Sequence, residues 1–90
     1  MEKPLETLRE EIDAIDNEII TLIAKRLRVV SDIGKVKKEK NIPPLDANRW
    51  EKVLQKITQK AKENNVPVEL VEKIYREIHH TALSIQKKHE

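Results

Sequence analysis

The sequence predicts an all-α fold with three helices per chain, one long and two shorter, that assembles as an intertwined homodimer. Helix breakers are rare, since the 90 residues include one glycine and four prolines. Apolar residues recur three or four positions apart over long stretches, which is typical of a buried helix face. Turn-forming residues gather at two internal places, 41–44 and 62–67, and these divide the chain into three helical segments.

The first helix is expected from about residue 5 to about residue 39. Pro4 suits its start because a proline at the first turn loses no needed N–H donor. At 1.5 Å per residue this helix is about 50 Å long, whereas a compact domain of this size is roughly 30–35 Å across. Part of the helix must therefore project, and it carries an apolar stripe of Leu5, Leu8, Ile12, Ile15, Ile19 and Leu22. A second, antiparallel copy would cover that stripe.

The second helix is expected to begin at Asp46, a residue type that caps helix N-termini well. Leu45 and Trp50 stand at the two positions of a hydrophobic staple around that cap. The third helix is expected to begin at Pro67 and to carry an apolar face of its own, and the last five residues, 86–90, are expected to fray.

The composition excludes several classes of protein. No cysteine is present, so disulfides and thiolate metal sites are ruled out. Charged residues make up 38% of the chain but balance to +2 and are interspersed, with only two aromatic residues, which argues against nucleic-acid binding. No apolar run is long enough for a membrane span, and the N-terminus is unlike a signal peptide. We expect a soluble, cytoplasmic chain that forms one domain over residues 1–90.

Two cations interrupt the apolar seam of the first helix. The three-and-four spacing leads through positions 26 and 37, which hold Arg26 and Lys37. Because an unpaired buried charge costs several kcal/mol, two interpretations are open. The side chains reach water or pair with carboxylates on the other helices, or they face a cavity that holds an anion.

The rest of the sequence favours the cavity. Gln86 is the last residue of a stripe on the third helix, and Lys37 is the last residue of the seam on the first helix. The amide of Gln86 and the ammonium of Lys37 could therefore donate to the same acceptor. Arg49 adds a cation in the first turn of the second helix, where anions are also favoured. Arg9 lies 17 residues before Arg26, about 25 Å along the same helix, so it can join the site only from the partner chain. Such a site suits a small dianion, with an arginine on each carboxylate. The stripe that ends at Gln86 consists of Tyr75, His79, Ala82 and Gln86.

This set of residues holds no convincing nucleophile, general base or metal pair. His79 and His80 are adjacent and about 100° apart on a helix, so they are expected at the surface or at an interface. The first-helix carboxylates Asp13, Asp16 and Glu18 have the spacing of solvated faces. A cation-rich pocket of this kind suits a reaction that needs only conformational restraint and charge stabilisation.

Four segments carry a resemblance to a known family: "LREEIDAIDNEIITLIAKR", "IGKVK", the D-x-x-R of Asp46 and Arg49, and Gln86. With them, nearly the whole chain resembles the all-helical class of chorismate mutases. Enzymes of this class rearrange chorismate to prephenate, a branch point toward phenylalanine and tyrosine, and work without a cofactor as intertwined dimers. The resemblance implies that Arg26 and the partner's Arg9 hold the two substrate carboxylates. It implies that Lys37 and Gln86 donate to the ether oxygen, where negative charge grows.

The resemblance further implies that the main chain of Asp46 lies near the ring hydroxyl of the substrate and that Arg49 adds positive field. Two positions depart from the family pattern. Many members follow the helix-2 arginine with a glutamate that contacts the hydroxyl, but this chain has Trp50, with Glu51 one step away. Ala82 stands where some members have a serine near a carboxylate. Both are counted as substrate-binding residues.

These departures leave alternatives open. Isochorismate-pyruvate lyases, which form salicylate, share the fold and much of the site, and a mutase for an amino-chorismate analogue is a further relative. A non-enzymatic alternative is a helical dimer that docks on another shikimate-pathway enzyme as a regulatory module.

Overall fold

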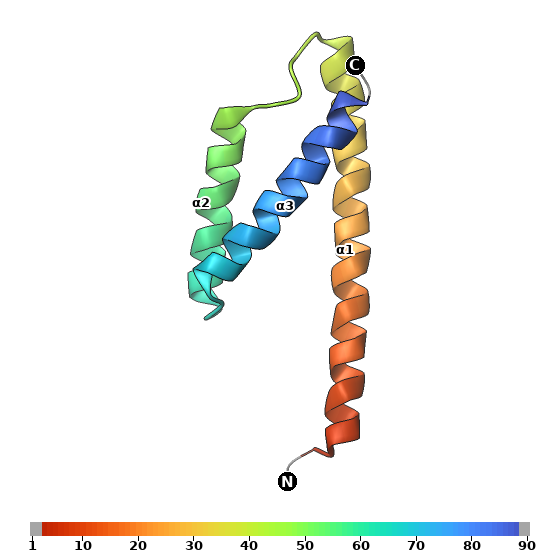
Figure 1. Cartoon of the computed structure of the whole chain (residues 1–90), viewed down its shortest axis with the longest axis vertical. Coiled ribbons are helices and arrows are strands. Elements are labelled where there is room, and N and C mark those ends of the chain that lie inside the picture. The colour runs from red at the N-terminus through yellow and green to blue at the C-terminus, as the bar shows by residue number, and fades with distance from the viewer. Residues whose placement is uncertain (1–2, 89–90) are drawn as a thin grey trace.

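The structure, a computed structural model, describes residues 3–88 and contains three α-helices and no strand within that range (Figure 1). The helices are α1 (Leu5–Glu39), α2 (Ala47–Glu63) and α3 (Val68–Lys87). The predicted all-α class, with one long and two shorter helices, is confirmed. None of these helices is long and apolar enough to cross a membrane.

The helix ends lie close to the predicted positions. Pro4 and Pro67 directly precede α1 and α3. Because α3 continues through Lys87, the expected fraying is wrong for Gln86 and Lys87. Residues 89 and 90, which end that expected tail, lie outside the described residues.

The helix α3 lies between the other two and crosses them diagonally (Figure 1). It contacts both α1 and α2, while α1 and α2 make no helix–helix contact with each other within residues 3–88. The N-terminal half of α1 extends beyond both shorter helices, as its length predicts (Figure 1). The molecule is accordingly elongated, with extents of 59 × 23 × 15 Å.

A tight turn after α1 brings the following loop back onto the helix. Asn41 adopts φ 56°, a left-handed conformation that asparagine tolerates better than most residues. The N–H of Ile42 donates to the carbonyl of Lys37 at 2.8 Å, the long bond of a Schellman motif. Asn65, at φ 57°, ends α2 in the same way. The turn after α1 leads into the two prolines and places the Pro44 carbonyl within reach of the Lys37 ammonium.

The single chain buries few side chains. Its buried apolar residues within the described range are Val30, Ala61 and Ala82, and no large side chain is fully buried. The stripe on the projecting half of α1 remains open, since its side chains are between 43% and 62% exposed. Its six members are Leu5, Leu8, Ile12, Ile15, Ile19 and Leu22. The apolar face that the sequence predicts to be buried is therefore not covered by residues 3–88 of its own chain.

Candidate active site

A partly open cavity of about 500 Å³ is lined by the C-terminal half of α1, the start of α2 and the end of α3. The structure brings seven of the eight predicted site residues together around it. They are Arg26, Lys37, Asp46, Arg49, Trp50, Ala82 and Gln86.

Lys37 is the centre of the hydrogen-bond network in this cavity. Its ammonium donates to the carbonyl of Pro44 at 2.6 Å and to Oε1 of Gln86 at 2.8 Å. The two contacts join α1 to the loop before α2 and to the end of α3. A lysine ammonium has three N–H donors, so one donor is left for a molecule in the cavity.

Gln86 is 9% exposed, although it stands near the end of its helix. Because its Oε1 accepts from Lys37, the amide is held in one orientation. Its Nε2, with two N–H donors, makes no hydrogen bond within residues 3–88. The amide and the ammonium therefore offer neighbouring donors to the same space, as the two converging stripes predict.

Arg26 lies on α1, lines the cavity and contacts α3. Its guanidinium carbon is 5.7 Å from the centre of the Tyr75 ring, a cation–π contact across the two helices. No carboxylate pairs with it, since the only salt bridge within residues 3–88 joins Lys3 and Glu11. The expectation that Arg26 pairs with a carboxylate on another helix is therefore not met. The contact with Tyr75 leaves the charge of Arg26 uncompensated.

Asp46 and Arg49 form the start of α2. The Asp46 side chain accepts the main-chain N–H of Arg49 at 3.0 Å, which confirms the predicted N-cap. Leu45, the other residue of the predicted staple, is 54% exposed.

Four cations line the cavity against the one carboxylate of Asp46, so the site is strongly positive. The cations are Lys25, Arg26, Lys37 and Arg49.

Trp50 forms one wall of the cavity together with His79. The indole and the imidazole stack with ring centres 3.9 Å apart and planes 7° from parallel. His79 is half-buried and lines the cavity, whereas its neighbour His80 is exposed. The expected surface position is thus confirmed for His80, whereas an interface position of His79 stays a prediction.

The surroundings of His79 disfavour its charged form. Burial lowers the pKa of its imidazole below the ordinary value of 6.5. Repulsion by Arg26, His80 and Lys37 lowers that pKa further. At neutral pH the imidazole is therefore uncharged and carries one hydrogen-bond donor and one acceptor.

Two predicted site residues differ in how the single chain places them. Ala82 is buried, 5% exposed, and forms part of the cavity wall. Arg9 is exposed on the projecting half of α1 and does not line the cavity. Its distance along the helix agrees with the expectation that it cannot reach Arg26 of its own chain.

Among the charged and polar side chains that line the cavity, the sequence reasoning missed two, Lys25 and His79. Lys25 directly precedes Arg26 and stands outside the apolar seam. Lysines at such positions usually belong to a solvated helix face, so no sequence pattern predicted that it lines the cavity. For His79 a signal existed, because it is three residues before Ala82 and seven before Gln86 on one helix face.

The chemistry available to this cavity is electrostatic. Within residues 3–88 no group of three or more metal-ligating side chains comes together. The cavity offers fixed donors and positive charge, which suit an anion that develops more charge on one oxygen as it reacts.

Comparison with known proteins assigns the family. Residues 8–87 match the family model of chorismate mutase type II. The chain belongs to this family, and the resemblance inferred from the sequence is confirmed.

Individual relatives agree with the assignment. The chain is 32% identical over 89 residues to the chorismate mutase of Methanocaldococcus jannaschii, covering 99% of this chain and 90% of that protein. It is 38% identical over 87 residues to the bifunctional chorismate mutase/prephenate dehydratase of Aquifex aeolicus, covering 93% of this chain and 24% of that protein. It is 39% identical over 72 residues to the T-protein of Haemophilus influenzae, covering 80% of this chain and 19% of that protein. The chain thus spans about a quarter or less of the two longer relatives.

A solved structure supports the fold. The conserved hypothetical protein from Pyrococcus furiosus matches with a TM-score of 0.69 and 35% sequence identity. The match covers 96% of this chain and 99% of that chain, so the three-helix arrangement extends over both.

Proposed function

We propose that this chain is a chorismate mutase, an isomerase that converts chorismate to prephenate in phenylalanine and tyrosine biosynthesis. Membership of the family supports the assignment. The observation that carries it is the Lys37–Gln86 pair, which offers N–H donors that make no other bond within residues 3–88 to a cavity rich in cations. No cofactor is required, because the rearrangement moves electrons within one molecule.

In the reaction, the ether C–O bond of chorismate breaks while a new C–C bond joins the enolpyruvyl carbon to the ring. Negative charge grows on the ether oxygen as the C–O bond lengthens. The third N–H of Lys37 and an N–H of Gln86 donate to that oxygen. Since these donors are already held by their own contacts, they stabilise the transition state with little reorganisation.

Cations hold the substrate in its reactive shape. Arg26 binds one carboxylate and the partner's Arg9 binds the other, while Arg49 adds positive field from α2. Asp46 offers its main chain near the ring hydroxyl, and Ala82 and Trp50 close the walls. Holding both carboxylates folds the side chain of chorismate over its ring, which removes much of the entropic cost of the rearrangement.

We infer that the functional form is an intertwined homodimer. Within residues 3–88 one chain buries three apolar side chains, too few for a stable domain of this length. Six large apolar side chains on α1 are roughly half exposed, and covering each with a second chain would contribute on the order of 1 kcal/mol. The partner's α1, running antiparallel, supplies this cover and carries the second arginine to the site.

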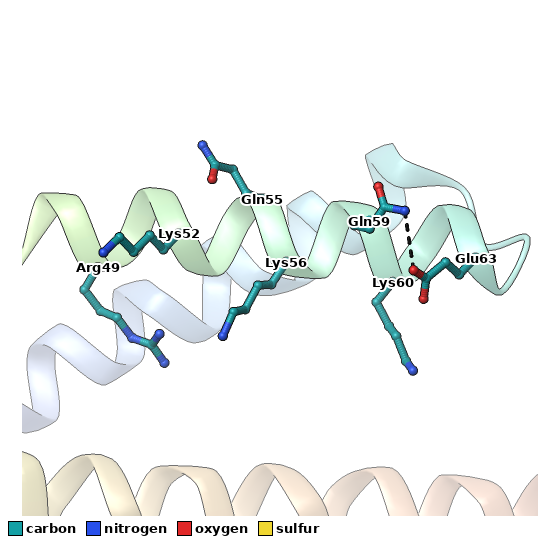
Figure 2. Close-up of a pocket in the computed structure, with 7 residues that line it drawn as sticks. All are labelled: Arg49, Lys52, Gln55, Lys56, Gln59, Lys60 and Glu63. Atoms are coloured by element: carbon teal, nitrogen blue, oxygen red, sulfur yellow. Dashed lines mark hydrogen bonds between the residues drawn. The ribbon is translucent and has the colours of Figure 1, made fainter.

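Charge supports the same arrangement. A shallow groove of about 390 Å³ runs along α2, and Arg49, Lys56 and Lys60 extend from it on the side toward α1 (Figure 2). The projecting half of α1 holds one cation, Arg9, against six carboxylates. These acidic residues are Glu6, Glu10, Glu11, Asp13, Asp16 and Glu18. An acidic half-helix of one chain beside the basic side of α2 in the other would add favourable, salt-sensitive attraction.

Two further expectations from the sequence remain proposals. Residues 1–90 form one chorismate mutase-like domain, and the chain acts in the cytoplasm. Docking to another shikimate-pathway enzyme remains a prediction that the fold does not require.

The substrate is tested by direct comparison. The purified chain is incubated with chorismate and, separately, with isochorismate, and the products are identified by chromatography. We expect prephenate from chorismate and little salicylate from isochorismate. Salicylate and pyruvate as dominant products would make the chain a lyase, and turnover of neither compound would favour a docking module.

Mixing two inactive variants tests whether sites are shared between chains. Arg9→Ala and Arg26→Ala are each expected to be nearly inactive, because every site loses one arginine. After subunit exchange, each mixed dimer regains one site with both arginines. Random pairing makes half of the dimers mixed, so about a quarter of wild-type activity should return. No recovery despite confirmed exchange would contradict the shared site.

A further inference from the structure

We propose that His79 accepts a hydrogen bond from the ring hydroxyl of the substrate and thereby determines specificity for it. This inference rests on the proposed function. It assigns to an imidazole on α3 a contact that the sequence leaves without a side-chain partner, since position 50 holds tryptophan.

The polar groups of the cavity lead to His79 by their hydrogen-bonding roles. The four cations can only donate, and so can the indole of Trp50. The carbonyl oxygen of Gln86 accepts from Lys37, and the carboxylate of Asp46 caps α2. Neither ring nitrogen of His79 makes a hydrogen bond within residues 3–88. Oδ2 of Asp46 makes no hydrogen bond within residues 3–88 either, but it carries negative charge. His79 is therefore the uncharged cavity-lining side chain whose acceptor group makes no hydrogen bond within the described residues.

The stack on Trp50 fixes how this acceptor is presented. Because the rings are 3.9 Å apart and nearly parallel, the indole covers one face of the imidazole. The ring nitrogens lie at the edge, in the ring plane, so stacking leaves them able to bond. His79 and Gln86 lie seven residues apart on one face of α3, about 10 Å along the axis. A small molecule between them can meet the amide donors of one and the acceptor of the other.

The charges around His79 are consistent with an acceptor role. Cations face it from α1 and α2, its exposed neighbour His80 adds to them, and one carboxylate stands at the start of α2. Together with burial, this environment lowers the pKa of His79, so the nitrogen lone pair stays available at neutral pH. The charged and titratable groups concerned are Lys25, Arg26, Lys37, Asp46, Arg49 and His80.

The test compares two substrates on matched variants. One substrate is chorismate, and the other is an analogue in which hydrogen replaces the ring hydroxyl. His79→Phe keeps an aromatic ring beside Trp50 but removes the acceptor, whereas His79→Gln keeps a neutral acceptor. His80→Gln serves as the control on an exposed neighbour. For each protein, kcat/KM is measured with both substrates.

We expect His79→Phe to lower kcat/KM for chorismate by about threefold to tenfold, the effect of one neutral hydrogen bond, and to leave the analogue unchanged. His79→Gln should retain most of the preference for chorismate, and His80→Gln all of it. Lowering the pH should erode the preference of the wild type as His79 takes up a proton, but not that of His79→Gln.

Contrary results fall into two distinguishable kinds. If the wild type rearranges chorismate but His79→Phe affects both substrates equally, His79 only supports the cavity wall and the inference is overturned. An unchanged kcat/KM in His79→Phe overturns it as well. If the wild type rearranges no chorismate at all, the proposed function fails and the role of His79 fails with it.

Discussion

Replacing Lys37 with methionine removes the donor on which the proposed mechanism depends. Methionine keeps the unbranched apolar stem of the side chain and removes its ammonium. In the native site that ammonium donates to Pro44 at 2.6 Å and to Gln86 at 2.8 Å. The substitution therefore acts on two quantities, the stability of the fold and the rate of the reaction.

The effect on stability follows from the acceptors that remain. Gln86 is 9% exposed, so its Oε1 loses its partner in a place that water reaches poorly. An acceptor left unsatisfied in this way costs about 1–3 kcal/mol. Removing a cation from beside Arg26 and Arg49 relieves repulsion and offsets part of that cost. We expect the free energy of unfolding to fall by about 1 kcal/mol.

The effect on rate is larger. A preorganised donor to a developing oxyanion is worth about 10²–10³ in kcat, or roughly 3–4 kcal/mol. Since the interaction strengthens as charge grows on the ether oxygen, kcat should fall more than KM rises. A fall of about 1 kcal/mol in the free energy of unfolding leaves most molecules folded, so it cannot by itself lower kcat a hundredfold.

The assay follows the loss of chorismate absorbance at a temperature where the variant is folded, as judged by circular dichroism. Lys38→Met is the matched control, because Lys38 is exposed on the same helix and lies outside the cavity. It should keep wild-type activity and stability. A folded Lys37→Met enzyme with kcat within threefold of the wild type would refute the role of Lys37 at the ether oxygen.

Three further predictions address the assembly, a helix cap and pH. Ile12→Asp puts a charge into the open stripe of α1 and should shift the protein toward monomer or unfolded chain in sedimentation velocity. Asn17→Asp, at an exposed position of the same helix, should leave the dimer intact. A dimer that neither variant affects would exclude this interface. Asp46→Ala removes the acceptor for the Arg49 N–H and should cost about 1 kcal/mol in urea unfolding, while Asp46→Asn should cost much less. The folded-state pKa of His79 lies below 6.5, so the unfolded chain takes up the proton first as the pH falls. The free energy of unfolding should therefore be greatest above about pH 6.5 and should decrease until the pH passes the folded-state pKa. Urea unfolding between pH 5 and 7.5 measures this dependence, which should be weaker in His79→Gln.

The helices could be predicted because the forces that define them are local. The prolines at 4 and 67, the asparagines at 41 and 65, and the cap at Asp46 act within one turn of their own positions. Lys37 and Gln86 could also be paired from sequence. Each polar residue ends an apolar stripe, and packing two such stripes together leaves their ends to meet.

The wall of the cavity could not be predicted in the same way. Trp50 and His79 are 29 residues apart, and their stack depends on the angle at which α3 crosses α2. Local patterns gave Trp50 a role at the helix start and gave His79 a place at the surface or an interface. The periodicity of α3 put His79 on the face that includes Gln86, but only the packing of the helices decides that this face lines a cavity.

The Trp50–His79 pair changes the electrostatics of the site as well as its shape. A glutamate at position 50 could accept from a ring hydroxyl, but its negative charge would oppose the cations that bind a dianion. A neutral imidazole accepts the same hydrogen bond without adding that charge. Its acceptor is lost on protonation, whereas the positive field on the carboxylates then increases. Acid should therefore weaken recognition of the hydroxyl before it weakens binding of the dianion, and a carboxylate acceptor would be lost only at a lower pH.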